Sequence, residues 1–195
     1  PKLIRSFIKS YFLDTLENIL FTETCLFDDC EFFCNLCCMP ELPEVETVRI
    51  FLKKNVIQKK ILSIKIEDSN LRFQISNEIP IKLRNSMITK ILRRGKYLLF
   101  LYSNEYGVLF HLGMTGFFRL EENYNYRKHD HFIFNYHKKK LIFNDIRKFG
   151  FIKIYTRKRI FDCSHLKNLG PEPLSSEFCS EYFSKNLNRN TCIKN

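Results

Sequence analysis

Short apolar runs dominate the middle of the chain and predict a fold rich in β-strands. Leu62, Ile64 and Ile66 alternate with Ser63 and Lys65, which is the period of a half-buried strand. Five further runs have the length and composition of strands: Tyr97–Tyr102, Val108–Leu112, His131–Tyr136, Leu141–Phe143 and Phe151–Tyr155. Turn signals separate these runs, at Arg94-Gly95, Tyr106-Gly107, Gly113, Gly116 and His137–Lys140.

A helix is predicted at each end of this series of strands. The first follows Pro43, which suits the first helical position, and its apolar residues recur at helical spacing: Val45, Val48, Leu52 and Val56. The second covers Phe178–Leu187, after the breaking segment 170–173, with Ser175 or Ser176 as its expected N-cap. The order of helix, many short strands and helix favours a mainly β protein, a two-layered β-sandwich with flanking helices.

The charge is unevenly distributed along the 195 residues, and this divides the chain. The net charge is +11, from 32 Lys and Arg against 21 Asp and Glu. Residues 1–38 hold three basic and six acidic side chains, so they carry −3 and residues 39–195 carry +14. Five of the eight cysteines also precede Met39. We therefore expect an extension outside the fold over residues 1–38, a β-sandwich domain over 39–174, and a helix with the start of a linker over 175–195.

The charge, the apolar runs and the cysteine spacing limit the classes of function that fit this chain. The positive charge of residues 39–195 indicates a polyanionic partner. No apolar run approaches the roughly 18 residues of a membrane-spanning helix, so a membrane protein is not expected. The scattered Cys163, Cys179 and Cys192 form no spaced framework, which favours a reducing, cytoplasmic compartment.

Two groups of residues raise the alternative of a metal site. Cys34 and Cys37 form a Cys-x-x-Cys with Cys30 nearby, but no second spaced pair follows. A zinc-dependent interaction module within residues 25–38 therefore stays an alternative. His129 and His131 would share one face of a strand by alternation, yet no third ligand is evident. We expect no metal ligands in this chain.

Six motifs follow one another between residues 39 and 195. They are Met39-Pro40-Glu41-Leu42-Pro43-Glu44-Val45-Glu46-Thr47-Val48-Arg49, Arg93-Arg94-Gly95-Lys96-Tyr97-Leu98-Leu99, His111-Leu112-Gly113-Met114-Thr115-Gly116, Lys128-His129-Asp130-His131, Asp145-Ile146-Arg147-Lys148-Phe149-Gly150 and Leu169-Gly170-Pro171-Glu172-Pro173-Leu174. In this order they resemble the bacterial formamidopyrimidine-DNA glycosylases, base-excision repair enzymes that remove oxidised purines. One such motif alone is a weak signal, whereas six in one order span most of the chain after Met39.

The resemblance implies a nucleophile at the start of the domain. In the family, the mature enzyme begins at the proline after the initiator Met, and the amine of that proline attacks C1′ of the damaged nucleotide. Pro40 is then the nucleophile and Glu41 the proton-transferring residue. An α-amine has a pKa near 8, so a useful fraction is unprotonated at neutral pH. The iminium that forms permits β,δ-elimination of the flanking phosphates.

One feature of the sequence departs from this mechanism. Pro40 follows Met39, so its nitrogen is a tertiary amide and cannot form a Schiff base. The family mechanism therefore requires a chain that begins at Pro40.

The resemblance also implies a DNA-binding surface. Family enzymes flip the damaged base out of the helix and fill the vacated space with three side chains, which correspond here to Met114, Arg147 and Phe149. Further residues implied to contact DNA or to serve the active site are Lys96, His111, His129 and Lys194. The implied partner is double-stranded DNA with oxidised bases or abasic sites, bound by a monomer in the bacterial cytoplasm and its nucleoid.

Family members also have a second domain, with a helix–two-turn–helix and a four-cysteine zinc finger. No spaced Cys-x-x-Cys pairs follow residue 39, so we expect a C-terminally truncated chain without a cofactor, the structural zinc belonging to the finger. Two alternatives stay open: an inactive remnant with weak non-specific DNA binding, and an endonuclease VIII-like glycosylase for oxidised pyrimidines. The set of Met114, Arg147 and Phe149 favours the purine enzymes.

Overall fold

The computed structural model describes residues 40–187, which form two units. One unit holds the described residues up to Lys167 and the other those from Asn168, and each is described by itself. The predicted extension over residues 1–38 and the predicted DNA contact of Lys194 lie outside the described residues. Within the described part, no helix is long and apolar enough to cross a membrane.

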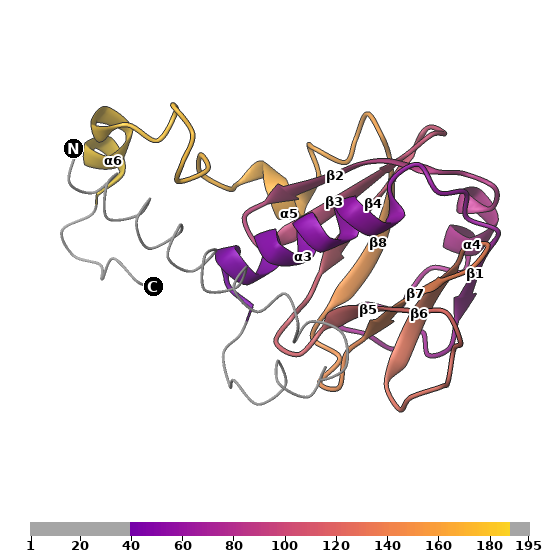
Figure 1. Cartoon of the computed structure of the whole chain (residues 1–195). Coiled ribbons are helices and arrows are strands. Elements are labelled where there is room, and N and C mark those ends of the chain that lie inside the picture. Colours follow the sequence, from indigo (N-terminus) through magenta and orange to yellow (C-terminus); the bar gives the residue numbers. More distant parts are fainter. Residues whose placement is uncertain (1–39, 188–195) are drawn as a thin grey trace. The chain divides into compact units, whose positions relative to one another are not determined.

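Two antiparallel sheets make up the first unit (Figure 1). One sheet has the order β1 (Ser63–Ile66), β6 (Asp130–Asn135), β7 (Lys140–Asn144) and β5 (Phe117–Glu121). The other has the order β2 (Ile88–Arg94), β3 (Tyr97–Tyr102), β4 (Tyr106–His111) and β8 (Phe151–Thr156). The prediction of a two-layered β-sandwich with flanking helices is confirmed.

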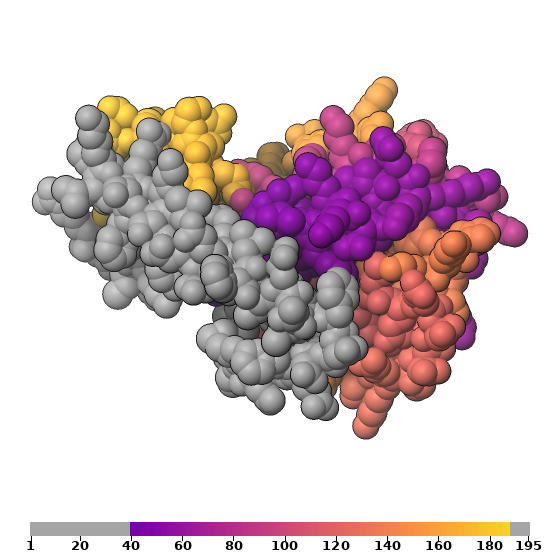
Figure 2. All heavy atoms as spheres, viewed as in Figure 1, coloured from indigo at the N-terminus to yellow at the C-terminus, as the bar shows by residue number. Residues whose placement is uncertain are grey.

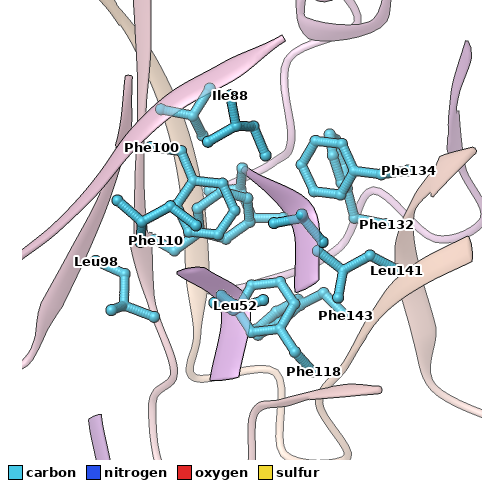
Figure 3. Packing of buried hydrophobic residues seen from close by; sticks show 14 of the residues in the cluster. Leu52, Ile88, Leu98, Phe100, Phe110, Phe118, Phe132, Phe134, Leu141 and Phe143 are labelled. Atoms are coloured by element: carbon cyan, nitrogen blue, oxygen red, sulfur yellow. The ribbon is translucent and has the colours of Figure 1, made fainter. Parts of the chain in front are cut away.

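Phenylalanine side chains from both sheets meet in the core between them (Figure 3). The rings of Phe100 and Phe134 lie 6.3 Å apart, and those of Phe110 and Phe143 lie 6.1 Å apart. All four side chains are fully buried. Burying a side chain of this size contributes about 1.5–3 kcal/mol, so the contact between the sheets is a main source of stability.

Helix α3 (Leu42–Val56) packs along β2 and β3 with Val45, Leu52 and Val56 buried. Its outer side forms a continuous ridge on the surface, coloured indigo in Figure 2. The helix begins where predicted, with Pro43 in its first turn, and the carboxylate of Glu44 accepts the Glu41 N–H at 2.9 Å. Three shorter helices are α4 (Glu78–Leu83), α5 (Ser164–Lys167) and, in the second unit, α6 (Ser180–Asn186).

The structure differs from the sequence-based prediction in several elements. Strands β2 and β5 were not predicted, because Lys90, Arg93 and Arg119 interrupt their apolar patterns; both are edge strands, where charged side chains are common. Gly107 lies inside β4 rather than in a turn. A Cβ there would come within 2.9 Å of Ile160, so this glycine permits close packing.

The second helix also begins later than predicted. Cys179 is the N-cap residue of α6, so neither Ser175 nor Ser176 caps it. Ser175 instead closes a turn, since its hydroxyl donates to the Glu172 carbonyl oxygen at 2.8 Å.

Candidate active site

Most of the predicted site residues of the first unit gather around one pocket of about 680 Å³. Its lining combines positive charge with apolar side chains: Arg72, Lys96, His111, Gly113, Met114, Arg147, Lys148 and Phe149. Phe149 is 46% exposed, and the Arg147 guanidinium lies 5.0 Å from the centre of its ring. A surface of this kind suits a ligand with anionic groups and flat rings.

Lys96 connects this pocket to the predicted nucleophile. It lies in the turn between β2 and β3, and its Nζ lies 3.3 Å from Oε1 of Glu41. Pro40 is the residue before Glu41, at the N-terminal end of α3. The structure therefore brings the predicted residues Glu41 and Lys96 together, although they are 55 positions apart in the sequence.

The apolar and cationic side chains of the pocket come from two turns that one buried carboxylate holds together. Asp145 accepts a hydrogen bond from the Thr115 hydroxyl at 2.5 Å and from the Gly150 N–H at 2.7 Å. The Arg147 N–H donates in turn to the Thr115 hydroxyl oxygen at 3.0 Å. Asp145 is completely buried, so it fixes the turn of Met114 against the turn of Arg147 and Phe149.

Gly113 is required where these two turns meet. Its φ is +67°, and a Cβ there would lie 2.4 Å from the Gly150 nitrogen and 2.6 Å from the Phe149 carbonyl carbon. Both neighbours are backbone atoms, so they can give way only if the turn of Phe149 shifts.

We expect Gly113→Ala to lower stability, by about 1–3 kcal/mol from backbone strain alone, and to weaken DNA binding because the turn of Phe149 must shift. Urea unfolding measures the first effect, and fluorescence anisotropy with a labelled duplex measures the second. An alanine variant with wild-type stability and affinity would contradict this account of the glycine.

His111 presents a neutral imidazole to the pocket. The Gly113 N–H donates to its Nδ1 at 3.0 Å, which leaves the ring proton on Nε2. Burial, together with the nearby charges of Lys96 and Arg72, lowers the pKa of His111 to about 4. The ring is therefore a hydrogen-bond donor without charge at neutral pH, and it stacks on Phe151 with centroids 5.5 Å apart.

His129 and His131 do not share a strand face as alternation suggested. His131 is completely buried in β6, with Nδ1 and Nε2 each 3.0 Å from a carbonyl oxygen, those of Asp68 and Asp145. His129 precedes the strand in a left-handed conformation, with φ +72°, and is partly exposed. Among residues 40–187 no three His, Cys, Asp or Glu side chains cluster in a way that could hold a metal ion.

His129 does not line the pocket, but its backbone is tied to the same framework. Its carbonyl oxygen accepts the Asp145 N–H at 3.1 Å. Asp145 therefore connects three motifs that are far apart in the sequence, those of His111, His129 and Arg147.

A second hollow of about 410 Å³ lies between α3, β2 and the segment before α5. Two of the three arginines in its lining share one carboxylate, since Glu46 pairs with Arg49 at 2.5 Å and with Arg93 at 2.8 Å. Burial is the largest single influence on the pKa of Glu46 and raises it. The hydrogen bonds and charges of Arg49 and Arg93 together outweigh burial, so this pKa lies below its usual value. This arrangement joins α3 to β2 and suits a structural role better than anion binding.

Comparisons with known proteins agree with the motifs. Residues 39–152 match the family model of the formamidopyrimidine-DNA glycosylase N-terminal domain. This chain belongs to the formamidopyrimidine-DNA glycosylase family. Among its curated relatives, formamidopyrimidine-DNA glycosylase of Rickettsia felis is 41% identical over 160 residues, which cover 80% of this chain and 58% of the relative. The corresponding protein of Bartonella quintana is 40% identical over 161 residues, covering 75% and 55%.

Solved structures of the formamidopyrimidine-DNA glycosylase family have the same fold. The Lactococcus lactis enzyme in complex with DNA containing an abasic site aligns with a TM-score of 0.70 and 33% identity, covering 75% of this chain and 55% of that one. A structure of MutM with DNA that contains carbocyclic 8-oxo-G aligns with the same TM-score and 34% identity, covering 75% and 56%. This chain thus spans just over half the length of the relatives that it matches.

Sequence reasoning missed Arg72, Lys148 and the central role of Asp145. Arg72 lies in the loop between β1 and α4, outside every motif, and reaches the pocket because its N–H donates to the Gly150 carbonyl oxygen at 3.1 Å. No local sequence signal marks it. Lys148 and Asp145 lie within a recognised motif, but their roles depend on contacts with Asp68, Thr115 and Gly150 that no spacing reveals.

Proposed function

We propose that this chain carries the catalytic half of a base-excision repair glycosylase that removes oxidised purines, 8-oxoguanine and formamidopyrimidines, from double-stranded DNA and then cleaves the abasic site. The observation that carries the proposal is an arrangement of two turns. Asp145 holds the turn of Met114 against the turn of Arg147 and Phe149. Both turns line one pocket, and Lys96 of that pocket contacts Glu41. Family membership supports it. The protein acts as a monomer on DNA of the bacterial nucleoid.

The proposed chemistry begins with the free amine of Pro40 in a chain that starts there. Its nitrogen forms a bond to C1′ of the damaged nucleotide, while the bond from C1′ to the base breaks and the base leaves with that electron pair and a proton. The C1′–O4′ bond of the sugar then breaks, O4′ leaves with that electron pair and takes up a proton, and the nitrogen lone pair forms the iminium. The iminium makes the C2′ proton acidic, so that elimination releases the 3′ phosphate and then the 5′ phosphate. Glu41, beside the nucleophile and 3.3 Å from Lys96, moves protons in these steps.

The pocket side chains would act on the DNA rather than on the reacting carbon. Extrusion of a base costs a few kcal/mol of stacking. Met114 and Phe149 are apolar and line the same pocket from two turns, so that they would fill the space that the base leaves, and Arg147 offers donors to the unpaired partner base. Lys96 and the neutral His111 donate to phosphates, and His129 and Lys194 add DNA contacts.

The structural zinc of the family has no place among the described residues, since none of their His, Cys, Asp or Glu side chains cluster in threes. In the proposed mechanism Pro40 and Glu41 carry the chemistry, and we propose no cofactor for this chain. The zinc belongs to the finger of the second domain.

Base release from defined duplexes tests this function. The full chain and a chain that starts at Pro40 are each incubated with DNA containing 8-oxoguanine, a formamidopyrimidine or an oxidised pyrimidine, and released base and strand cleavage are measured. We expect the Pro40 chain to act on the two purine lesions. Action on the pyrimidine alone would favour an endonuclease VIII-like enzyme, and binding without any release would favour the inactive remnant.

A further inference from the structure

A cluster of rings and cations lies beside the pocket on the outer face of the sheet β2-β3-β4-β8. We define the aromatic–basic patch as Arg72, Phe73, Tyr97, Phe151, Lys153 and His165. Tyr97 and Phe151 flank His111 across three neighbouring strands, because Tyr97 pairs with His111 and His111 with Phe151 in the sheet register. The patch is therefore continuous with the pocket through the stacked rings of His111 and Phe151.

Lys153 is held among the rings of this patch. Its ammonium lies 3.7 Å from the centre of the Phe73 ring and 5.5 Å from that of Phe151. It also lies 3.3 Å from Nε2 of His165, to which it can donate a hydrogen bond. Burial and the charges of Lys153 and Arg72 lower the pKa of His165, which favours the neutral ring that can accept the hydrogen bond of Lys153.

Arg72 brings a second positive charge to the same ring. Its guanidinium carbon lies 5.8 Å from the centre of Phe73, which is itself 40% exposed. Within residues 40–187, no aspartate or glutamate forms an ion pair with Arg72 or Lys153. In contrast, Lys148 pairs with Asp68 at 2.7 Å, and Lys96 with Glu41.

Arg72 and Lys153 share aromatic neighbours, and no carboxylate among the described residues pairs with either of them. Their positive charges can therefore both act on a bound anion. Cation–π contacts fix the position of an ammonium group without neutralising it. Because Arg72 lines both the patch and the pocket, an anion bound at the patch is adjacent to a ligand bound in the pocket. A polyanion with regularly spaced charges, such as duplex DNA, can occupy both at once.

We propose that the aromatic–basic patch binds a backbone phosphate of the duplex beyond the phosphates next to the damaged nucleotide, with Lys153 and Arg72 as its ligands. This proposal rests on the proposed function, since it extends the DNA contact of the same surface. Lys153 raises the affinity for DNA of any sequence and takes no part in the chemistry.

The salt dependence of DNA binding tests the role of Lys153. The full chain, Lys153→Met, Lys153→Arg and the control Lys59→Met are titrated with an undamaged labelled duplex between 50 and 200 mM salt. Lys59 follows the C-terminal end of α3, whose 15 residues place it roughly 22 Å from the end at Glu41. Thermal unfolding of each variant confirms that it is folded.

We expect Lys153→Met to reduce the slope of log K against log salt by about 0.9 and to weaken binding at 50 mM salt by about 3–10-fold. Lys153→Arg should keep most of the affinity, and Lys59→Met should match the wild type. If the salt-dependence slope of Lys153→Met equals that of Lys59→Met, the proposed phosphate site is wrong, and the proposed function is unaffected. A wild-type chain that binds no duplex at all would overturn both.

A scan of the DNA then locates the phosphate. Each backbone phosphate of an abasic-site duplex is replaced in turn by an uncharged methylphosphonate, and affinity is measured with the wild type and Lys153→Met. One position should weaken the wild type but not the variant, because the variant has already lost that contact. If every position weakens both proteins equally, Lys153 contacts no phosphate and the proposal fails.

Discussion

A chain that begins at Pro40 is expected to form a borohydride-stable crosslink with DNA containing an abasic site, and the full 195-residue chain is expected to form at least about 100-fold less. In the full chain the nitrogen of Pro40 is bonded to the carbonyl carbon of Met39, so its lone pair is delocalised into the amide. As a free secondary amine with a pKa near 8, the same nitrogen is partly unprotonated at neutral pH and can attack C1′. Gel electrophoresis of the reduced mixture measures the crosslinked fraction.

The matched control is the Pro40 chain with an acetylated N-terminus. It keeps every side chain of the site, including Glu41 and Lys96, and removes only the reactive amine. The acetylated chain should bind DNA as the free chain does and should give no crosslink. Equal crosslinking by the full chain, with the adduct located on a lysine by mass spectrometry, would mean that Pro40 is not the nucleophile.

The sequence predicted the parts of the fold whose signals are local. Helix α3 has its proline in the first turn and its apolar residues at helical spacing, and β3 was predicted with its observed bounds, Tyr97–Tyr102. The apolar strands are buried on both sides or nearly so, which makes their runs easy to recognise. Strands β2 and β5 were not predicted, because an edge strand tolerates charged side chains that interrupt its apolar pattern.

The site was predictable as a set of residues but not as an arrangement. The motifs named Met114, Arg147 and Phe149, and the pocket brings all three together. Their common support, Asp145, was hidden because its partners Thr115 and Gly150 come from two different turns. Arg72 and Lys153 belong to no motif, and only the folding of the β1–α4 loop onto Gly150 and β8 brings them together.

Replacing Asp130 by alanine is expected to lower the free energy of unfolding by about 3–5 kcal/mol, because a buried guanidinium then loses the carboxylate that accepts two of its hydrogen bonds and keeps only Glu121, at 2.8 Å. Asp130 is 1% exposed and Arg119 6% exposed. Two hydrogen bonds join them, from Nη1 to Oδ1 at 2.5 Å and from Nη2 to Oδ2 at 2.6 Å. Asn144 and the N–H of Arg127 donate to the same carboxylate at 2.8 Å and 3.0 Å. Urea unfolding at pH 7 measures the loss.

Two variants separate this ion pair from a general effect of charge. Asp162→Asn removes a negative charge at an exposed position and should change stability by less than about 0.5 kcal/mol. The double variant Arg119→Leu with Asp130→Leu removes both buried charges and should be more stable than Asp130→Ala, since no buried guanidinium remains and Glu121 keeps its ion pair with Arg127 at 3.1 Å. A loss below 1 kcal/mol for Asp130→Ala would show that the pair contributes little.

The contribution of Asp130 should also depend on pH in a defined direction. Burial raises the pKa of its carboxyl, but the hydrogen bonds from Arg119, Asn144 and the Arg127 N–H outweigh burial and hold this pKa below its usual value. In the unfolded chain an aspartate has a pKa near 3.9. At a pH between these two pKa values, the unfolded chain binds a proton at Asp130 and the folded protein does not. The stability that Asp130 contributes is therefore fully present above about pH 5 and is lost as the pH falls through the lower pKa of the folded state.

The stability difference between the wild type and Asp130→Asn should therefore stay constant from pH 8 to about pH 5 and shrink below it. The same carboxylate positions the turn of His129, since it accepts the Arg127 N–H and lies next to His129 in the chain. Asp130→Asn should consequently weaken DNA binding at pH 7 even under conditions where the variant is fully folded. If its affinity equals that of the wild type there, the ion pair stabilises the sandwich without shaping the DNA surface.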